Sequence, residues 1–168
     1  MDKTLKQSLQ IFATKARMGV LEGVYNAKAG HPGGSLSICD VLSYLYNVEM
    51  HVDPKNPNDP GRDRLVLSKG HAAPALYATL ALKGYFPVED LKTLRKSDSY
   101  LQGHPNMDKV PGIDMSTGSL GQGISVAVGM ALGGKLDKAD YRVYAILGDG
   151  EIEEGQVWEA AMLAGNKG

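Results

Sequence analysis

Apolar residues recur at three- and four-residue steps near the start of the chain, which predicts a long amphipathic helix over residues 5–28. Its expected buried stripe comprises Leu5, Leu9, Phe12, Ala16, Val20 and Val24. A second helix is predicted to begin at Ser37, because Asp40 follows three residues later as in a capping box. Its expected inward-facing residues are Val41, Leu42, Leu45 and Tyr46.

Two short apolar runs, residues 64–68 and 143–147, have the length and composition of buried strands. Each run meets a glycine-containing turn and then a helical pattern. The first of these helices is expected to run from about Pro74 to about Lys83, and the second to end at Gly165. Further helices are predicted over 88–96 and 124–132, the latter built of small residues that allow close packing on all sides. We therefore expect an α/β fold with a mostly parallel sheet and helices on both faces.

Composition narrows the class of protein. The chain has 168 residues, 43% of them hydrophobic and 22% charged, which suits one domain over residues 1–168 with its own core. Its net charge of -1 offers no basic face for nucleic acid or for an anionic membrane. No apolar run reaches the roughly 18 residues of a membrane span, and the single cysteine, Cys39, fits a reducing cytoplasm.

The turn Gly148-Asp149-Gly150 is a candidate ligand site, because it follows a strand and opens a helix. Two glycines permit positive φ and close backbone approach, and a carboxylate between them can hold a hard cation such as Mg²⁺ that bridges phosphate oxygens. A diphosphate would suit this junction. The alternative is an ordinary turn, since Asp-Gly is common in turns without a catalytic role.

Three of the four histidines, His31, His71 and His104, directly follow a glycine in a predicted loop. Each could be a surface or capping histidine. A zinc site fits poorly, because the histidines are far apart in sequence and lack a cysteine partner. Imidazoles that carry protons to and from a phosphorylated, polyhydroxylated substrate are an equally natural interpretation.

Five motifs occur in the order and approximate spacing that are seen in the N-terminal, diphosphate-binding part of transketolases, which the chain resembles over nearly its whole length. They are Gly30-His-Pro-Gly-Gly34, Leu67-Ser-Lys-Gly-His-Ala72, Gly103-His-Pro105, Ser116-Thr-Gly-Ser-Leu-Gly-Gln-Gly123 and Gly148-Asp-Gly-Glu-Ile-Glu-Glu-Gly155. The resemblance implies a thiamine diphosphate- and Mg²⁺-dependent enzyme that moves a two-carbon ketol unit between sugar phosphates, as in the pentose phosphate pathway.

The resemblance also implies roles for single residues. Asp149 matches the Mg²⁺ ligand, Gly150 a backbone contact to the diphosphate, and His71 a histidine beside the diphosphate and the reacting centre. His31 and His104 match histidines of the substrate channel that assist proton transfer. Gly118 and Leu120 match the backbone that touches the aminopyrimidine side of the cofactor, and Glu154 matches a glutamate at the subunit interface that links two active sites.

The chain departs from the family pattern in two respects. It ends before the asparagine motif that completes the metal site, and it lacks the pyrimidine-binding half. We therefore expect an N-terminal portion that needs a C-terminal transketolase subunit, as in two-chain transketolases, and that assembles as a homodimer or heterotetramer. Deoxyxylulose-phosphate synthase is a related alternative, which Gly30-His-Pro-Gly33 and Gly103-His-Pro105 disfavour. A Mg²⁺-phosphate enzyme such as a phosphotransferase and a non-enzymatic assembly fragment are two others.

Overall fold

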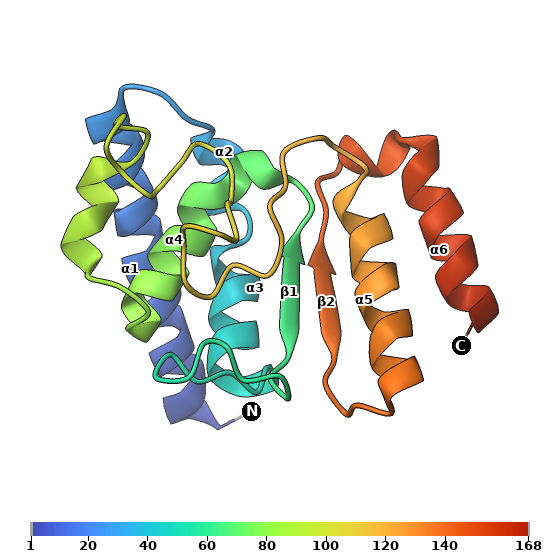
Figure 1. Cartoon of the computed structure of the whole chain (residues 1–168). Coiled ribbons are helices and arrows are strands. Elements are labelled where there is room, and N and C mark those ends of the chain that lie inside the picture. Colours follow the sequence, from blue (N-terminus) through green and yellow to red (C-terminus); the bar gives the residue numbers. More distant parts are fainter. Residues whose placement is uncertain (1, 168) are drawn as a thin grey trace.

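Two parallel strands lie between two groups of helices in a computed structural model that describes residues 2–167 (Figure 1). The elements in chain order are α1 (Lys3–Ala27), α2 (Pro32–Leu36), α3 (Cys39–Tyr44), a π-helical turn (Leu45–Glu49), β1 (Arg64–Leu67), a 3-10 turn (Gly70–Ala72), α4 (Ala73–Lys83), a 3-10 helix (Val88–Thr93), α5 (Gly123–Asp137), β2 (Val143–Ile146), a 3-10 turn (Glu151–Glu153) and α6 (Gly155–Lys167). Within residues 2–167, no helix is both long and apolar enough to cross a bilayer.

The sheet separates the two groups of helices. Arg64 pairs with Val143 and Leu67 with Ile146, so the strands run in the same direction and end at the same edge. Because side chains alternate between the faces of a strand, Leu65 and Leu67 enter the core that α1, α3 and α4 share. Ala145, on the other face of β2, meets α5 instead. Helices therefore cover both faces, and the α/β fold with a parallel sheet is confirmed.

The core lies on the α1, α3 and α4 side of the sheet. Every residue of α4 from Ala73 to Ala81 is buried, and α1 packs along it. Gly19 makes this close approach possible, because a Cβ there would lie 3.0 Å from the Cβ of Ala78 and 2.9 Å from Leu91 Cδ1. Glycine at position 19 thus allows α1 to pack closely against α4.

The second helix differs from its prediction. Ser37 does not cap it, because the glycine-rich residues before it form the separate helix α2, and the Ser37 hydroxyl donates to the carbonyl of Gly34 at 3.0 Å. Helix α3 begins at Cys39 instead, without a side-chain cap. Leu42 and Tyr46 are buried as expected, whereas Val41 is exposed.

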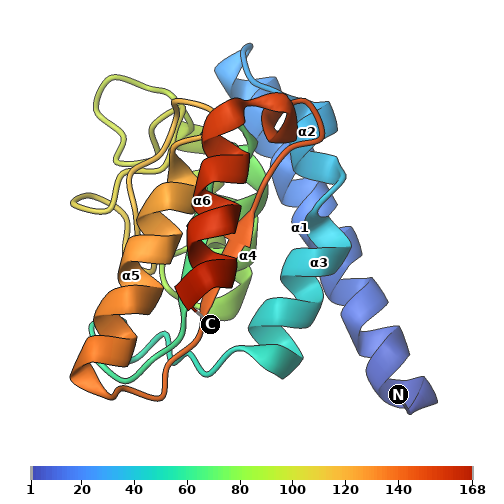
Figure 2. The ribbon, with the colours of Figure 1, turned by 90° about the vertical axis from the view of Figure 1, so that its right-hand side faces the viewer.

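The C-terminal elements are more open than predicted. All four residues of β2 are only half-buried, and α5 buries Gly123, Ala127 and Gly134 rather than packing on all sides. The reason is that, in the part of the chain described, β2 pairs with β1 along one edge and with no strand along the other. Gly165 does not end α6, and the predicted helix over 88–96 is a shorter 3-10 helix. Figure 2 shows α5 and α6 together on this side of the sheet.

The outer edge of β1 is protected by a loop. The Asp114 carboxylate accepts a hydrogen bond from Leu65 N at 2.6 Å, and the Thr117 hydroxyl donates to the carbonyl of Leu67 at 2.7 Å. Side chains of the loop thus satisfy backbone groups that a further strand would otherwise pair. These bonds hold the segment before α5 against the end of β1, next to the candidate site.

Candidate functional site

A pocket of about 450 Å³ is lined by residues that follow β1 and β2. The carboxyl ends of both strands lie at the top of the sheet in Figure 1. We call this pocket the strand-end pocket, and its lining comprises Gly33, Gly34, Ser37, Lys69, His71, Leu120, Gly148, Asp149, Gly150 and Glu151. Parallel strands that end at one edge bring the turns after β1 and β2 together, which is why segments far apart in sequence share this lining. The pocket lies at the edge where we expected a ligand.

The turn after β2 presents its carboxylate to solvent. Asp149 and Gly150 are both exposed, and a Cβ at Gly150 would meet nothing within 4 Å, so a ligand can approach this backbone closely. The expected positive φ is wrong: Gly150 has φ -70° and ψ -29°, and Gly148 is also outside the left-handed region. The turn therefore uses the small size of glycine rather than its conformational freedom.

Asp149 is the exposed carboxylate of the strand-end pocket, whereas Glu151 in the same lining is buried. Across residues 2–167, no three His, Cys, Asp or Glu side chains converge on a point that could hold a metal ion. An exposed carboxylate beside open backbone suits Mg²⁺, which takes six oxygen ligands and usually completes its shell with phosphate oxygens and water. Asp149 fits one position of such a shell, and the zinc interpretation of the histidines finds no support in the described residues.

Lys69 places a buried cation in the wall of the strand-end pocket, and the sequence analysis did not single it out. The residue is only 6% exposed. Its Nζ donates to the carbonyl of Gly34 at 3.1 Å and weakly to the Ser37 hydroxyl at 3.4 Å. No carboxylate among residues 2–167 forms an ion pair with it. A buried ammonium with neutral partners favours an anionic ligand, because burial of an uncompensated charge is costly.

Of the three predicted histidines, His71 lines the pocket and His31 contacts His71. The ring centroids of His31 and His71 lie 5.2 Å apart with the planes at 63°. His71 Nε2 also faces Gly34, where a Cβ would lie 3.2 Å away. Burial lowers the pKa of His71, and the neighbouring His31 and Lys69 lower it further. His71 is therefore neutral near pH 7 and able to accept a proton.

His104 belongs to a different part of the site. Its ring packs on Gly118, where a Cβ would lie 3.4 Å from His104 Cδ2, and Tyr77 OH donates to its carbonyl at 3.0 Å. Partial burial lowers the pKa of His104, and the charge of Arg95 adds to the effect. The fourth histidine, His51, lies beside Asp63, away from the residues that line the pocket.

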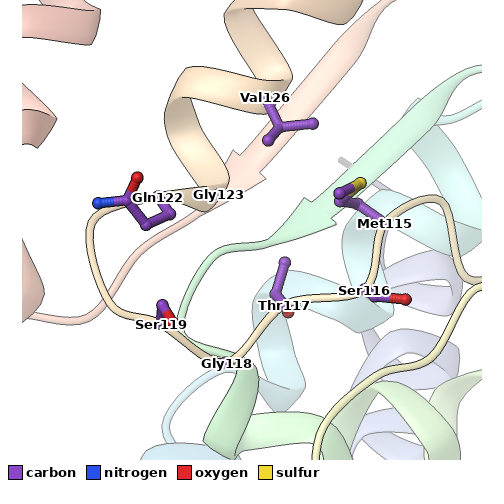
Figure 3. A pocket seen from close by; sticks show the side chains of 8 residues that line it. All are labelled: Met115, Ser116, Thr117, Gly118, Ser119, Gln122, Gly123 and Val126. Carbon is purple, nitrogen blue, oxygen red and sulfur yellow. The ribbon is translucent and has the colours of Figure 1, made fainter.

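The loop before α5 places Gly118 and Leu120 on different sides. Leu120 lines the strand-end pocket with Asp149, whereas Gly118 lines a second pocket of about 400 Å³, which we call the loop pocket. Figure 3 shows this loop pocket between residues 115–119 and the first turns of α5, with Val126 on the helix side. Gly70 permits the arrangement, because a Cβ there would lie 2.8 Å from the Gly118 backbone nitrogen.

Glu151 is the residue of the site that sequence reasoning missed most clearly. It is 2% exposed, and its carboxylate accepts three hydrogen bonds, from the Ser68 hydroxyl at 2.5 Å, Gly121 N at 2.9 Å and Gly148 N at 2.9 Å. The only signal in the sequence was its position directly after Gly150. Glu154, the predicted interface residue, is exposed and lies against Gly121.

Comparison with known proteins gives one consistent family. The family model described as "Transketolase, thiamine diphosphate binding domain" matches residues 9–168. The 6-deoxy-6-sulfo-D-fructose transketolase subunit of Clostridium sp. is 57% identical over 159 residues, which are 95% of this chain and 58% of that protein. An apulose-4-phosphate transketolase subunit of Phocaeicola vulgatus is 50% identical over 161 residues, or 96% of this chain and 57% of that protein. The chain thus spans somewhat more than half the length of these two relatives.

Solved structures agree with the sequence comparison. Transketolase from Campylobacter jejuni superimposes with a TM-score of 0.90 at 38% identity, over 99% of this chain and 27% of that one. Transketolase from Leishmania mexicana gives a TM-score of 0.87 at 33% identity, over 94% and 25% of the two chains. The likeness therefore includes sequence as well as fold.

Proposed function

Because this chain belongs to the transketolase family, with the thiamine diphosphate-binding domain over residues 9–168, we propose that it forms the cofactor-binding part of an enzyme that transfers a two-carbon ketol unit between sugar phosphates. The observation that carries the proposal is the strand-end pocket, where Asp149, Lys69 and His71 share one lining at the carboxyl ends of two parallel strands. An exposed carboxylate for a metal, a buried cation and a neutral imidazole form a set suited to a Mg²⁺-bound diphosphate.

Different residues of the pocket would contact different parts of the cofactor. Asp149 would supply one oxygen ligand to Mg²⁺, and the open backbone at Gly150 would receive the diphosphate. Lys69, whose ammonium donates to the carbonyl of Gly34, would supply a positive charge to the same anion. Leu120 lines the same pocket, and its backbone would contact the aminopyrimidine side. When bound, thiamine diphosphate supplies the nucleophilic carbon and electron sink for carbon–carbon bond cleavage and formation.

The histidines handle protons of the sugar hydroxyl groups. His71, held neutral by burial, accepts a proton near the cofactor, and the adjacent ring of His31 passes protons toward solvent. His104, which is exposed and packs on Gly118, would act on the substrate from the Gly118 side. The substrates in this proposal are sugar phosphates.

A partner subunit completes the active site in this proposal. The two relatives described above are themselves named as transketolase subunits. Glu154 is exposed and lies against Gly121, and in this proposal it links two active sites across a subunit interface. Trp158 and Met162 leave apolar surface on α6. We propose that the partner is a C-terminal transketolase subunit, in a cytoplasmic assembly that is either a heterotetramer or based on a homodimer of this chain.

The test combines the chain with a candidate C-terminal partner and measures ketol transfer from a ketose phosphate to an aldose phosphate. Thiamine diphosphate and Mg²⁺ should both be required for turnover. Condensation of pyruvate with glyceraldehyde 3-phosphate in place of ketol transfer would favour the deoxyxylulose-phosphate synthase alternative. Binding of a nucleotide but not of thiamine diphosphate would favour a phosphotransferase, and assembly without binding of either would favour a non-enzymatic module.

A further inference from the structure

A single buried side chain joins three segments of the strand-end pocket. One oxygen of Glu151, Oε1, accepts from the Ser68 hydroxyl after β1 and from Gly121 N in the loop before α5. The other oxygen, Oε2, accepts from Gly148 N in the turn after β2. The donors come from positions 68, 121 and 148, so the carboxylate connects segments that are far apart along the chain.

The charge of Glu151 is satisfied by these donors alone. In the described part of the chain it forms no ion pair with Lys, Arg or His. A buried carboxylate is stable in such surroundings only when its oxygens accept hydrogen bonds, and bonds to an ionised acceptor are roughly twice as strong as neutral ones. The Glu151 carboxylate is thus hydrogen-bonded by backbone and hydroxyl donors. The ammonium of Lys69 therefore stays available to a ligand.

These hydrogen bonds connect two sides of the strand-end pocket, which we call the Leu120 wall and the Asp149 wall. A ligand that spans the pocket would touch both. Gly121 directly follows Leu120, and Gly148 directly precedes Asp149. Leu120 and Asp149 both line the strand-end pocket. Because the two oxygens of a carboxylate are held at a constant separation, their bonds to Gly121 N and Gly148 N set the spacing between the Leu120 wall and the Asp149 wall.

We propose that Glu151 is a positioning residue that sets this spacing for a ligand that reaches both walls at once. The inference rests on the proposed function, in which the diphosphate lies at Asp149 and the aminopyrimidine side at Leu120. Glu151 acts through Gly121 and Gly148 and takes no part in the chemistry. A ligand confined to one wall gains little from it.

Glutamine cannot replace glutamate in this arrangement. Its amide has one acceptor oxygen and one NH2 group, whereas Gly121 N and Gly148 N are both donors that face opposite oxygens of Glu151. Whichever way the amide points, one N–H faces another donor. The wall that loses its bond moves away, although the local structure of each wall is retained.

The experiment compares two ligands on the chain assembled with its C-terminal partner. Thiamine diphosphate spans both walls, whereas inorganic pyrophosphate reaches only the Asp149 wall, and each is titrated at constant Mg²⁺ by Trp158 fluorescence or calorimetry. Glu151→Gln should weaken thiamine diphosphate binding by at least about 10-fold, the lower range for residues that orient a ligand shell. Pyrophosphate binding should weaken by no more than about threefold, within the range of one neutral hydrogen bond.

Two further variants separate this role from a general loss of stability. Glu153→Gln changes an exposed carboxylate in the same 3-10 turn and should leave both affinities unchanged. Ser68→Ala removes only one of the three donors to Glu151, and it carries the test if Glu151→Gln does not fold. It should produce the same selective loss at about two- to fivefold, as expected for a single hydrogen bond.

Equal losses for the two ligands, or no loss for either, would overturn the inference and leave the proposed function intact. A wild-type assembly that binds pyrophosphate but not thiamine diphosphate would overturn both, because no spanning ligand would then exist. A selective loss of thiamine diphosphate with unchanged thermal unfolding would establish Glu151 as the residue that spaces the walls.

Discussion

The imidazole rings of His31 and His71 face each other edge to face, with centroids 5.2 Å apart, although a long stretch of chain separates them. The contact forms because α2 begins directly after His31 and brings Gly34 against His71, where no side chain intervenes. Two imidazoles this close cannot both carry a positive charge without repulsion, so the neutral state of one is favoured. Their pairing gives the pocket a proton acceptor that works near neutral pH.

At pH values below about 6.5, the free energy of unfolding should decrease, partly because of His71. Burial and His31 lower its pKa in the folded chain from the usual 6.5, so only the unfolded chain gains the proton as the pH first drops. Stability present above pH 6.5 is therefore lost as the pH falls toward the folded pKa. His71→Gln should therefore show a smaller decrease in the free energy of unfolding from pH 7.5 to pH 5.5, as measured by urea unfolding curves. His51→Gln, whose ring is 91% exposed, should not reduce it, and equal slopes for wild type and His71→Gln would contradict the prediction.

Asp149→Ala should weaken Mg²⁺-dependent binding of thiamine diphosphate by at least about 10-fold in the assembled protein, because a direct ligand should cost no less than an outer-shell partner. The measurement is a cofactor titration at limiting Mg²⁺. Asp140→Ala, which removes another exposed carboxylate from the loop before β2, is the matched control and should bind normally. An unchanged titration for Asp149→Ala would mean that the glycine-flanked turn holds no metal.

Lys69→Met should weaken both thiamine diphosphate and pyrophosphate by about 10-fold or more, since hydrogen bonds to charged groups contribute about 1.5–3 kcal/mol. The reason is that Lys69 brings a buried charge without a carboxylate partner to the wall of the pocket. Lys92→Met removes a lysine whose side chain is 54% exposed and should have no effect on either ligand. Loss of affinity in Lys69→Met but full affinity in Lys69→Gln would point to the Gly34 contact rather than to the charge.

The regular elements could be predicted from sequence wherever a local pattern determines them. The helical stripe of α1 and the two apolar runs that became β1 and β2 were visible because apolar spacing decides local structure. The start of α3 was not, since Ser37 satisfies a capping pattern but is used to end α2. A serine such as Ser37 can begin one helix or end another, and the sequence pattern alone does not show which of the two the tertiary structure selects.

The candidate site was predictable only in part, and for a related reason. Glycine-flanked residues such as Asp149 and His71 stood out because unusual backbone surrounds them. Lys69 and Glu151 did not, because their importance comes from burial and from partners far away in sequence. A buried glutamate looks the same in sequence as the exposed Glu153 two positions later. Only the folded arrangement of three segments distinguishes them.

The apolar face of α6 gives the last prediction, which concerns assembly. Trp158 is 60% and Met162 is 66% exposed, and they lie one helical turn apart on the same helix. Apolar side chains grouped in this way are typical of contact surfaces, and a central contact residue often contributes at least about 2 kcal/mol to binding. Met162→Lys should therefore weaken the association between copies of this chain by about 10-fold or more, as measured by sedimentation velocity over a dilution series.

A matched control lies on the opposite side of the molecule. Met18, on α1, is 65% exposed, so Met18→Lys makes the same chemical change at nearly the same exposure far from α6 (Figure 1). It should leave the assembly unchanged. Trp158 reports the same event, because its indole donates to the carbonyl of Ile152 at 2.8 Å and otherwise faces solvent, so burial by a partner should shift its emission to shorter wavelength. A folded monomer at micromolar concentration, with Trp158 emission independent of dilution, would show that the α6 face is not an interface between copies of this chain.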